Sequence, residues 1–121
     1  MRTPRILVVD DSWTELALMA APLKEQGYEV ITASDGEEAI DKVVSTSPDC
    51  VVLDIVMPGQ NGFQVCRRIK QTPQGHNIPV IFVSTKNTSL DKQWAYQQGA
   101  AAYLTKPFRG DDLVACIRQM I

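Results

Sequence analysis

Acidic residues and one lysine follow short apolar runs at widely separated points of the chain. Asp10 and Asp11 come directly after the first run, and Asp54 comes directly after the third. Ser84 follows the fourth run, and Lys106 follows the fifth. If these runs are parallel strands, their carboxyl ends share one edge of a sheet and the five side chains meet there. A single aspartate after a strand is most often a helix cap, so the prediction depends on the convergence of all five.

Such a cluster is suited to phosphoryl transfer. Three carboxylates held close together repel one another and raise one another's pKa unless a cation joins them. Mg²⁺ is the natural occupant, because it prefers oxygen ligands and leaves positions open for phosphate oxygens. Lys106 offers a positive charge to a phosphoryl group, and the Ser84 hydroxyl can hydrogen-bond one of its oxygens. A carboxylate can then attack phosphorus to form an aspartyl phosphate. A metal site alone would leave Lys106 and Ser84 without a role.

The elements that must position these residues alternate regularly. Short runs rich in β-branched residues predict five strands, at residues 6–9, 28–32, 50–53, 80–83 and 101–104. Between and after them, apolar residues recur at helical spacing, and Ser12-x-x-Glu15 and Asp35-x-x-Glu38 have the form of capping boxes. Parallel strands need helical crossovers, so we predict an α/β, doubly wound (βα)5 fold with helices on both faces of a parallel sheet.

Length and composition are those of one ordinary globular domain. The chain has 121 residues, 45% of them hydrophobic and 21% charged, and we expect a single domain over residues 1–121 with no output domain. A net charge of −2 without a Lys/Arg-rich run argues against nucleic acid as a partner. No apolar run approaches the roughly 18–20 residues that span a membrane. Three widely spaced cysteines, Cys50, Cys66 and Cys116, favour free thiols in the cytoplasm.

Taken together, these motifs resemble the bacterial response-regulator receiver family, the CheY-like domains of two-component systems. The resemblance covers essentially the whole chain. The acidic pair stands in Val-Val-Asp10-Asp11-Ser, the phosphoacceptor and its loop in Leu-Asp54-Ile-Val-Met-Pro-Gly, and the lysine in Lys106-Pro107. Ser84 matches the switch hydroxyl of the family, and Tyr103 matches its switch aromatic residue.

The resemblance implies a role for each of these positions. Asp54 is the phosphoacceptor, and Asp11, Asp54 and the backbone carbonyl of Val56 bind Mg²⁺ with help from Asp10. It also implies the strand order 2-1-3-4-5 and a cis peptide bond between Lys106 and Pro107. On phosphorylation, Ser84 moves toward the phosphoryl group, Tyr103 turns inward, and the surface of the fourth helix, fifth strand and fifth helix changes.

A narrower resemblance concerns the pathway. The stretches Asp11-Ser-Trp-Thr-Glu15 and Asp91-Lys-Gln-Trp94 resemble PilH-type single-domain regulators of type IV pilus, or twitching, and phototactic motility. This implies a CheA-like histidine kinase as phosphodonor, a downstream motility protein as partner, and a monomer or weak homodimer. We expect no enzyme activity beyond the protein's own phosphorylation and dephosphorylation. Trp94 could contact a partner protein, but its helical spacing from Leu90 favours a place in the core.

Several other functions remain open. A phosphate sink in the same pathway would need the same residues, and a metal-binding interaction scaffold would need only the carboxylates. A flavodoxin-like cofactor binder is disfavoured, because Asp10 and Asp11 would repel a cofactor phosphate. A small aspartyl-phosphate hydrolase is disfavoured too, because Val56 occupies the place of its second aspartate and no cap segment is evident.

Overall fold

The structure is a computed structural model that describes residues 3–57, 59 and 61–121. Pro58, part of the phosphoacceptor motif, lies outside these residues. The strands are β1 (Arg5–Val9), β2 (Glu29–Ala33), β3 (Cys50–Asp54), β4 (Val80–Ser84) and β5 (Ala102–Thr105). The helices are α1 (Trp13–Glu25), α2 (Gly36–Thr46), α3 (Gly62–Gln71), α4 (Ser89–Gln97) and α5 (Gly110–Met120). In the described part of the chain, none of these helices is long and apolar enough to span a membrane.

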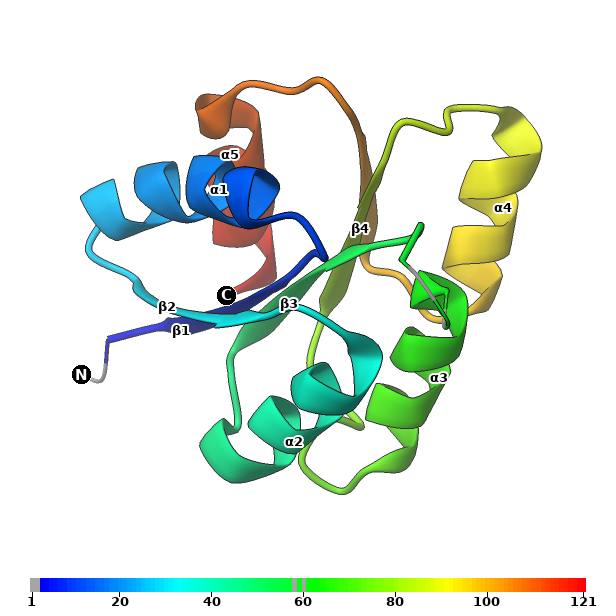
Figure 1. Cartoon of the computed structure of the whole chain (residues 1–121), viewed down its shortest axis with the longest axis horizontal. Coiled ribbons are helices and arrows are strands. Elements are labelled where there is room, and N and C mark those ends of the chain that lie inside the picture. Colours follow the sequence, from blue (N-terminus) through cyan, green and yellow to red (C-terminus); the bar gives the residue numbers. More distant parts are fainter. Residues whose placement is uncertain (1–2, 58, 60) are drawn as a thin grey trace.

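The five strands form one parallel sheet in the order β2-β1-β3-β4-β5, which confirms the predicted topology (Figure 1). The register pairs Val9 of β1 with Leu53 of β3, so the next residue of each segment, Asp10 and Asp54, emerges side by side with the other. The strand order reverses between β1 and β3, and the carboxyl ends of both strands therefore border the crevice where ligands bind in open α/β sheets.

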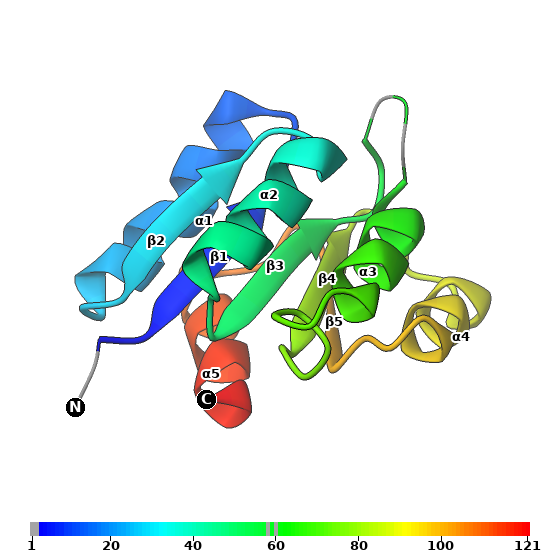
Figure 2. The same ribbon diagram turned by 90° about the horizontal axis from the view of Figure 1, so that it is seen from below.

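Alternating side chains of the central strands build two cores, one on each face of the sheet. Figures 1 and 2 show α1 and α5 on one face and α2 and α3 on the other. In β1, Leu7 and Val9 pack toward α2 and α3, whereas Ile6 and Val8 pack toward α1 and α5. The strands β1, β3 and β4 are buried on both faces, as their uninterrupted apolar runs predict.

The helix starts follow the expected capping pattern only in part. Ser12 and Asp35 each accept a hydrogen bond from the backbone N–H three residues on, as predicted. In both cases the glutamate does not accept the reciprocal bond from the backbone N–H of the capping residue. Glu38 accepts from the backbone N–H of Ser34, and the Glu15 carboxylate lies near Lys106. Complete boxes begin α3 at Asn61 and α4 at Thr88, two starts that the sequence pattern did not reveal.

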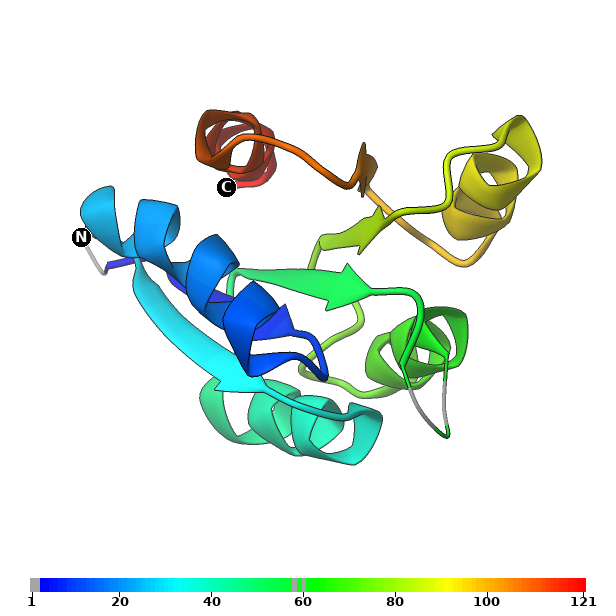
Figure 3. The ribbon, with the colours of Figure 1, turned by 45° about the horizontal axis from the view of Figure 1, so that its top comes forward.

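The prediction that Trp94 belongs to the core is wrong. Its side chain is 50% exposed, and Leu90, one turn earlier, is 62% exposed. The helix α4 lies beside β5 at the edge of the sheet (Figure 3), and among its described residues only Ala95 is buried. A helix that packs against a sheet edge buries a narrower stripe than one that lies across a face, so helical spacing alone overestimated its apolar contact.

Candidate functional site

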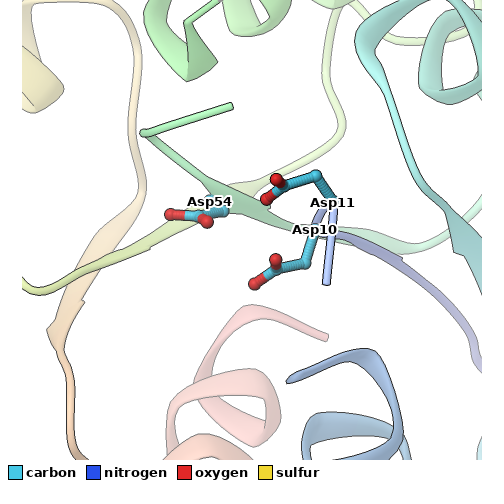
Figure 4. Close-up of side chains that lie close together, drawn as sticks. All are labelled: Asp10, Asp11 and Asp54. Carbon is cyan, nitrogen blue, oxygen red and sulfur yellow. The ribbon is translucent and has the colours of Figure 1, made fainter. Parts of the chain in front are cut away.

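Three carboxylates gather where β1 and β3 end. Asp10 and Asp11 follow β1, and Asp54 is the last residue of β3, so the parallel register places all three at one edge (Figure 4). One oxygen of each carboxylate lies within 4.8 Å of an oxygen of the other two. Asp10 and Asp54 are buried, whereas Asp11 is exposed at the mouth of the cluster.

Burial governs the protonation of Asp54. The side chain is close to fully buried and accepts one hydrogen bond, from the backbone N–H of Val56 at 3.3 Å. The pKa of Asp54 is raised to about 6: loss of solvent is the main cause and the charge of Asp10 adds to it, while the nearby Lys106 ammonium opposes the shift. Without a bound cation, the acidic cluster is therefore electrostatically strained at neutral pH.

Lys106 brings a positive charge to the cluster from the end of β5. Its Nζ donates a hydrogen bond to Asp10 Oδ2 at 3.0 Å and lies 3.9 Å from Asp54 Oδ2. Burial alone would lower the pKa of Lys106, but the bond to Asp10 and the charges of Asp54 and Glu15 outweigh this and raise it. The ammonium is therefore charged over the whole neutral range. The peptide bond between Lys106 and Pro107 is cis, as predicted.

Ser84 and Tyr103 both hydrogen-bond the backbone of Lys86. The buried hydroxyl of Ser84 accepts from the Lys86 N–H at 3.1 Å, and the Tyr103 hydroxyl donates to the Lys86 carbonyl at 2.6 Å. The O–H of Ser84 can still donate to another acceptor, because the bond from Lys86 uses only its oxygen. One residue of the loop after β4 thus links the two predicted switch side chains.

Glu15 is a neighbour of the site that the sequence pattern did not identify. It was expected to cap α1, but its Oε2 lies 3.6 Å from Lys106 Nζ. The only signal in the sequence is an acidic residue one turn into the helix that follows the aspartate pair. That signal has two explanations, and the capping pattern is the commoner one.

Two further positions shape the surroundings of the cluster. Gly62 begins α3 with its N–H donating to the Ile55 carbonyl at 2.7 Å, so the helix starts against the backbone that carries Asp54. Trp13, the first residue of α1, is 80% exposed beside the acidic pair. Trp13 therefore does not enclose the site, but its position makes its fluorescence a possible reporter of metal binding there.

The donor set fits a hard divalent cation. All three side-chain ligands are carboxylates, the ligand type that Mg²⁺ and Ca²⁺ prefer, and no sulfur or imidazole atom belongs to the group. The pKa of Asp54 is raised chiefly by burial, the charges of Asp10 and Asp11 add to the shift, and a bound cation would oppose it. The three cysteines, as free thiols, stand apart from the cluster.

Comparison with known proteins places this geometry in a family. Residues 6–118 match the response regulator receiver domain. The chain is 42% identical over 117 residues to protein PilH of Pseudomonas aeruginosa, covering 97% of each chain. It is also 38% identical to the alkaline phosphatase synthesis transcriptional regulatory protein PhoP of Bacillus subtilis, where it spans about half of the relative, 48% of its length.

Solved structures agree with the sequence relatives. The chemotaxis protein CheY4 of Vibrio cholerae superposes with a TM-score of 0.95 at 29% identity, covering 99% of this chain and 100% of that one. The receiver domain of a sensor histidine kinase from Pseudomonas aeruginosa, with a magnesium ion coordinated in its active-site cleft, superposes with a TM-score of 0.90 at 25% identity, covering 98% of each. The family match, the PilH-like sequence and the CheY-like fold lead to one conclusion: this chain belongs to the response regulator receiver domain family of two-component systems.

Proposed function

We propose that this protein is a phosphorylation switch that accepts a phosphoryl group on Asp54. The observation that carries the proposal is the position of the Asp54 carboxylate, which lies beside two further carboxylates and 3.9 Å from the Lys106 ammonium. A structural ion pair needs only one carboxylate, and the surplus of negative charge calls for a cation and a reacting group. The domain that does this work is taken as residues 1–121.

Mg²⁺ is the proposed cofactor. Asp10, Asp11 and Asp54 would hold it, together with the backbone carbonyl of Val56. When bound, the ion would offset the charge of the carboxylates and of the incoming phosphoryl group. The magnesium ion in the cleft of the related histidine-kinase receiver domain supports this choice.

The reaction is a displacement at phosphorus. A carboxylate oxygen of Asp54 forms a bond to the phosphorus, and the bond from phosphorus to the donor's leaving atom breaks, with the electron pair leaving on the donor. Lys106 Nζ donates to a phosphoryl oxygen and offsets the charge that develops there. No other substrate is turned over: the protein catalyses only its own phosphorylation and the later attack of water on the phosphoryl group.

The proposed output is a change of surface. A phosphoryl group adds about −1.5 to −2 charges at the end of β3. The Ser84 O–H turns to it as a donor, and the shared bonds to Lys86 pass the movement to Tyr103. Tyr103 lies on β5 next to α4, so an inward turn of its ring alters the face formed by α4, β5 and α5.

The proposed pathway is motility control. The identity of 42% with PilH favours a CheA-like histidine kinase as donor and a motility protein as the downstream partner, in the cytoplasm, with the receiver a monomer or weak homodimer. A phosphate sink in the same pathway is the second candidate. A stable phosphoryl mimic such as beryllofluoride distinguishes them, since it would increase partner binding by a regulator and leave a sink without a partner.

Intact mass after incubation with acetyl phosphate tests the central proposal. We expect a single phosphoryl adduct that requires Mg²⁺ and is lost in Asp54→Asn. Asp41→Asn, an exposed carboxylate on α2, is the matched control and should be labelled like the wild type. The contrary outcome is that a control receiver is labelled while this protein neither is labelled nor binds beryllofluoride, a stable mimic that does not hydrolyse. The carboxylates would then form a metal-binding scaffold instead.

A further inference from the structure

The carboxylate of Glu15 has been released from its capping role. In a complete capping box it would accept a hydrogen bond from the backbone N–H of Ser12. That N–H donates to Asp10 Oδ1 instead, at 3.0 Å. Glu15 therefore extends from the first turn of α1 toward Lys106, with Oε2 3.6 Å from Nζ. The same aspartate that binds Lys106 has freed a second carboxylate to compete for it.

Among the described residues, three carboxylates lie within 4 Å of the Lys106 ammonium. Asp10, at 3.0 Å, and Asp54, at 3.9 Å, both belong to the acidic cluster. Glu15 does not belong to it. A cation in the cluster would offset the charges of Asp10 and Asp54 but would leave that of Glu15. Once the cluster is filled, Glu15 is the remaining anion that attracts Lys106 away from a phosphoryl group.

The Lys106 ammonium and the Glu15 carboxylate border one partly solvated space. Glu15 and Lys106 line the same cavity, of about 350 Å³, between α1 and the segment that joins β5 to α5. The Lys106 side chain is 15% exposed and that of Glu15 is 42% exposed. The pair is therefore partly screened by solvent, and its effect is a graded one.

Resting on the proposed phosphorylation of Asp54, we propose that Glu15 is a positioning residue that holds the Lys106 ammonium toward α1 and slows phosphoryl transfer. Lys106 stabilises the negative charge on the transferring group less when its ammonium is paired with another anion. The residue thus sets the rate of phosphorylation without contacting the reacting atoms.

Glu15→Gln tests this inference, because it keeps the size of the side chain and removes its charge. At saturating Mg²⁺, the rate constant for labelling by acetyl phosphate should rise about two- to fivefold, the size expected for one partly exposed charge pair. Glu25→Gln, at the exposed end of the same helix, changes the net charge equally and should label at the wild-type rate. An unchanged or slower rate in Glu15→Gln, or an equal gain in Glu25→Gln, would overturn the proposal.

A second comparison shows whether the effect passes through Lys106. In a Lys106→Met background, which lowers the rate by itself, adding Glu15→Gln should give no further gain. If the gain persists there, Glu15 acts by another route and the inference is wrong.

A third measurement needs no phosphoryl transfer. The effects of Glu15→Gln and Lys106→Met on the free energy of unfolding in urea should be non-additive, because each removes the partner of the other. Additive effects would contradict the pairing. A wild type that is labelled while Glu15→Gln gains nothing refutes this inference alone, whereas an unlabelled wild type beside a labelled control receiver refutes the proposed function.

Discussion

At the scale of single residues, two opposing influences act on the pKa of Asp54. Its pKa is raised to about 6, chiefly by burial, which disfavours the charged form that attack on phosphorus requires. Lys106 acts in the other direction, since its ammonium favours the carboxylate. A bound cation would act with Lys106. At neutral pH a pKa of about 6 leaves most of Asp54 ionised, so the expected need for a metal rests on offsetting the charge of the phosphoryl group rather than on ionising the carboxyl.

The pKa of Asp54 gives a testable effect on stability. Its value is raised on folding, so between about pH 4 and pH 6 the folded state binds more protons than the unfolded state, and stability falls as pH rises. Without divalent cations, Asp54→Asn should therefore be more stable than the wild type by about 2 kcal/mol at pH 8. At pH 4, where the carboxyl is protonated in the folded state, most of this difference should vanish.

Urea unfolding of both proteins at the two pH values, in EDTA, measures the effect. Comparing the mutant with the wild type at each pH removes the contribution of the other titrating groups. A stability difference that is the same at pH 4 and pH 8 would show that the carboxylate of Asp54 is not under strain.

At the scale of elements, the start of α3 sets the path of the chain after β3. The helix begins at Gly62, which is buried against the backbone of Asp54 and Ile55. A Cβ atom there would collide with the Asp54 carbonyl oxygen and approach the Ile55 Cα to 2.7 Å. Both neighbours are backbone atoms and cannot move aside as a flexible side chain would. Glycine at this point is therefore required by close packing.

Gly62→Ala should consequently lower the free energy of unfolding by about 2 kcal/mol or more. It should also slow labelling of Asp54, because α3 would have to shift the backbone of the phosphoacceptor. Gly27→Ala is the matched control: its φ of +87° costs about 1 kcal/mol, but a Cβ there meets no atom within 4 Å and the position is remote from β3. Wild-type stability and labelling in Gly62→Ala would contradict the close packing.

At the scale of the whole molecule, the site joins loops that follow β1, β3, β4 and β5. A cation bound by Asp10, Asp11 and Asp54 would connect the ends of two strands that are far apart along the chain. Such a ligand binds the folded state and finds no assembled site in the unfolded chain, so it must stabilise the fold.

Mg²⁺ at about 100 times its dissociation constant should therefore raise the free energy of unfolding by about 2.7 kcal/mol. Thermal or urea unfolding, followed by far-UV circular dichroism of the five helices, measures this shift. The same ionic strength supplied as NaCl is the control for general screening. Asp54→Asn should lose most of the gain, and a gain equal in NaCl and MgCl₂ would argue against a specific site.

The sequence by itself determined the strands, their parallel arrangement and the set of candidate site residues. These depend on local signals: apolar runs for buried strands, and charged residues directly after them at the edge where parallel strands end. The observed strand order and the cis Lys106-Pro107 bond agree with what the family resemblance implied. The chemical roles of the site residues remain proposals, since they concern reactions rather than positions.

Only the tertiary structure decided how the neighbouring groups share the site. The sequence pattern predicts Glu15 as a helix cap. In the structure, Asp10 accepts the hydrogen bond from the Ser12 N–H that Glu15 would accept as a cap, and the Glu15 carboxylate lies beside Lys106. Helical spacing predicts Trp94 as a core residue. In the structure, α4 lies at the sheet edge and half of Trp94 is exposed to solvent. Both outcomes depend on contacts between segments distant in the chain, and a local pattern contains no information on which of several possible partners such a contact brings closest.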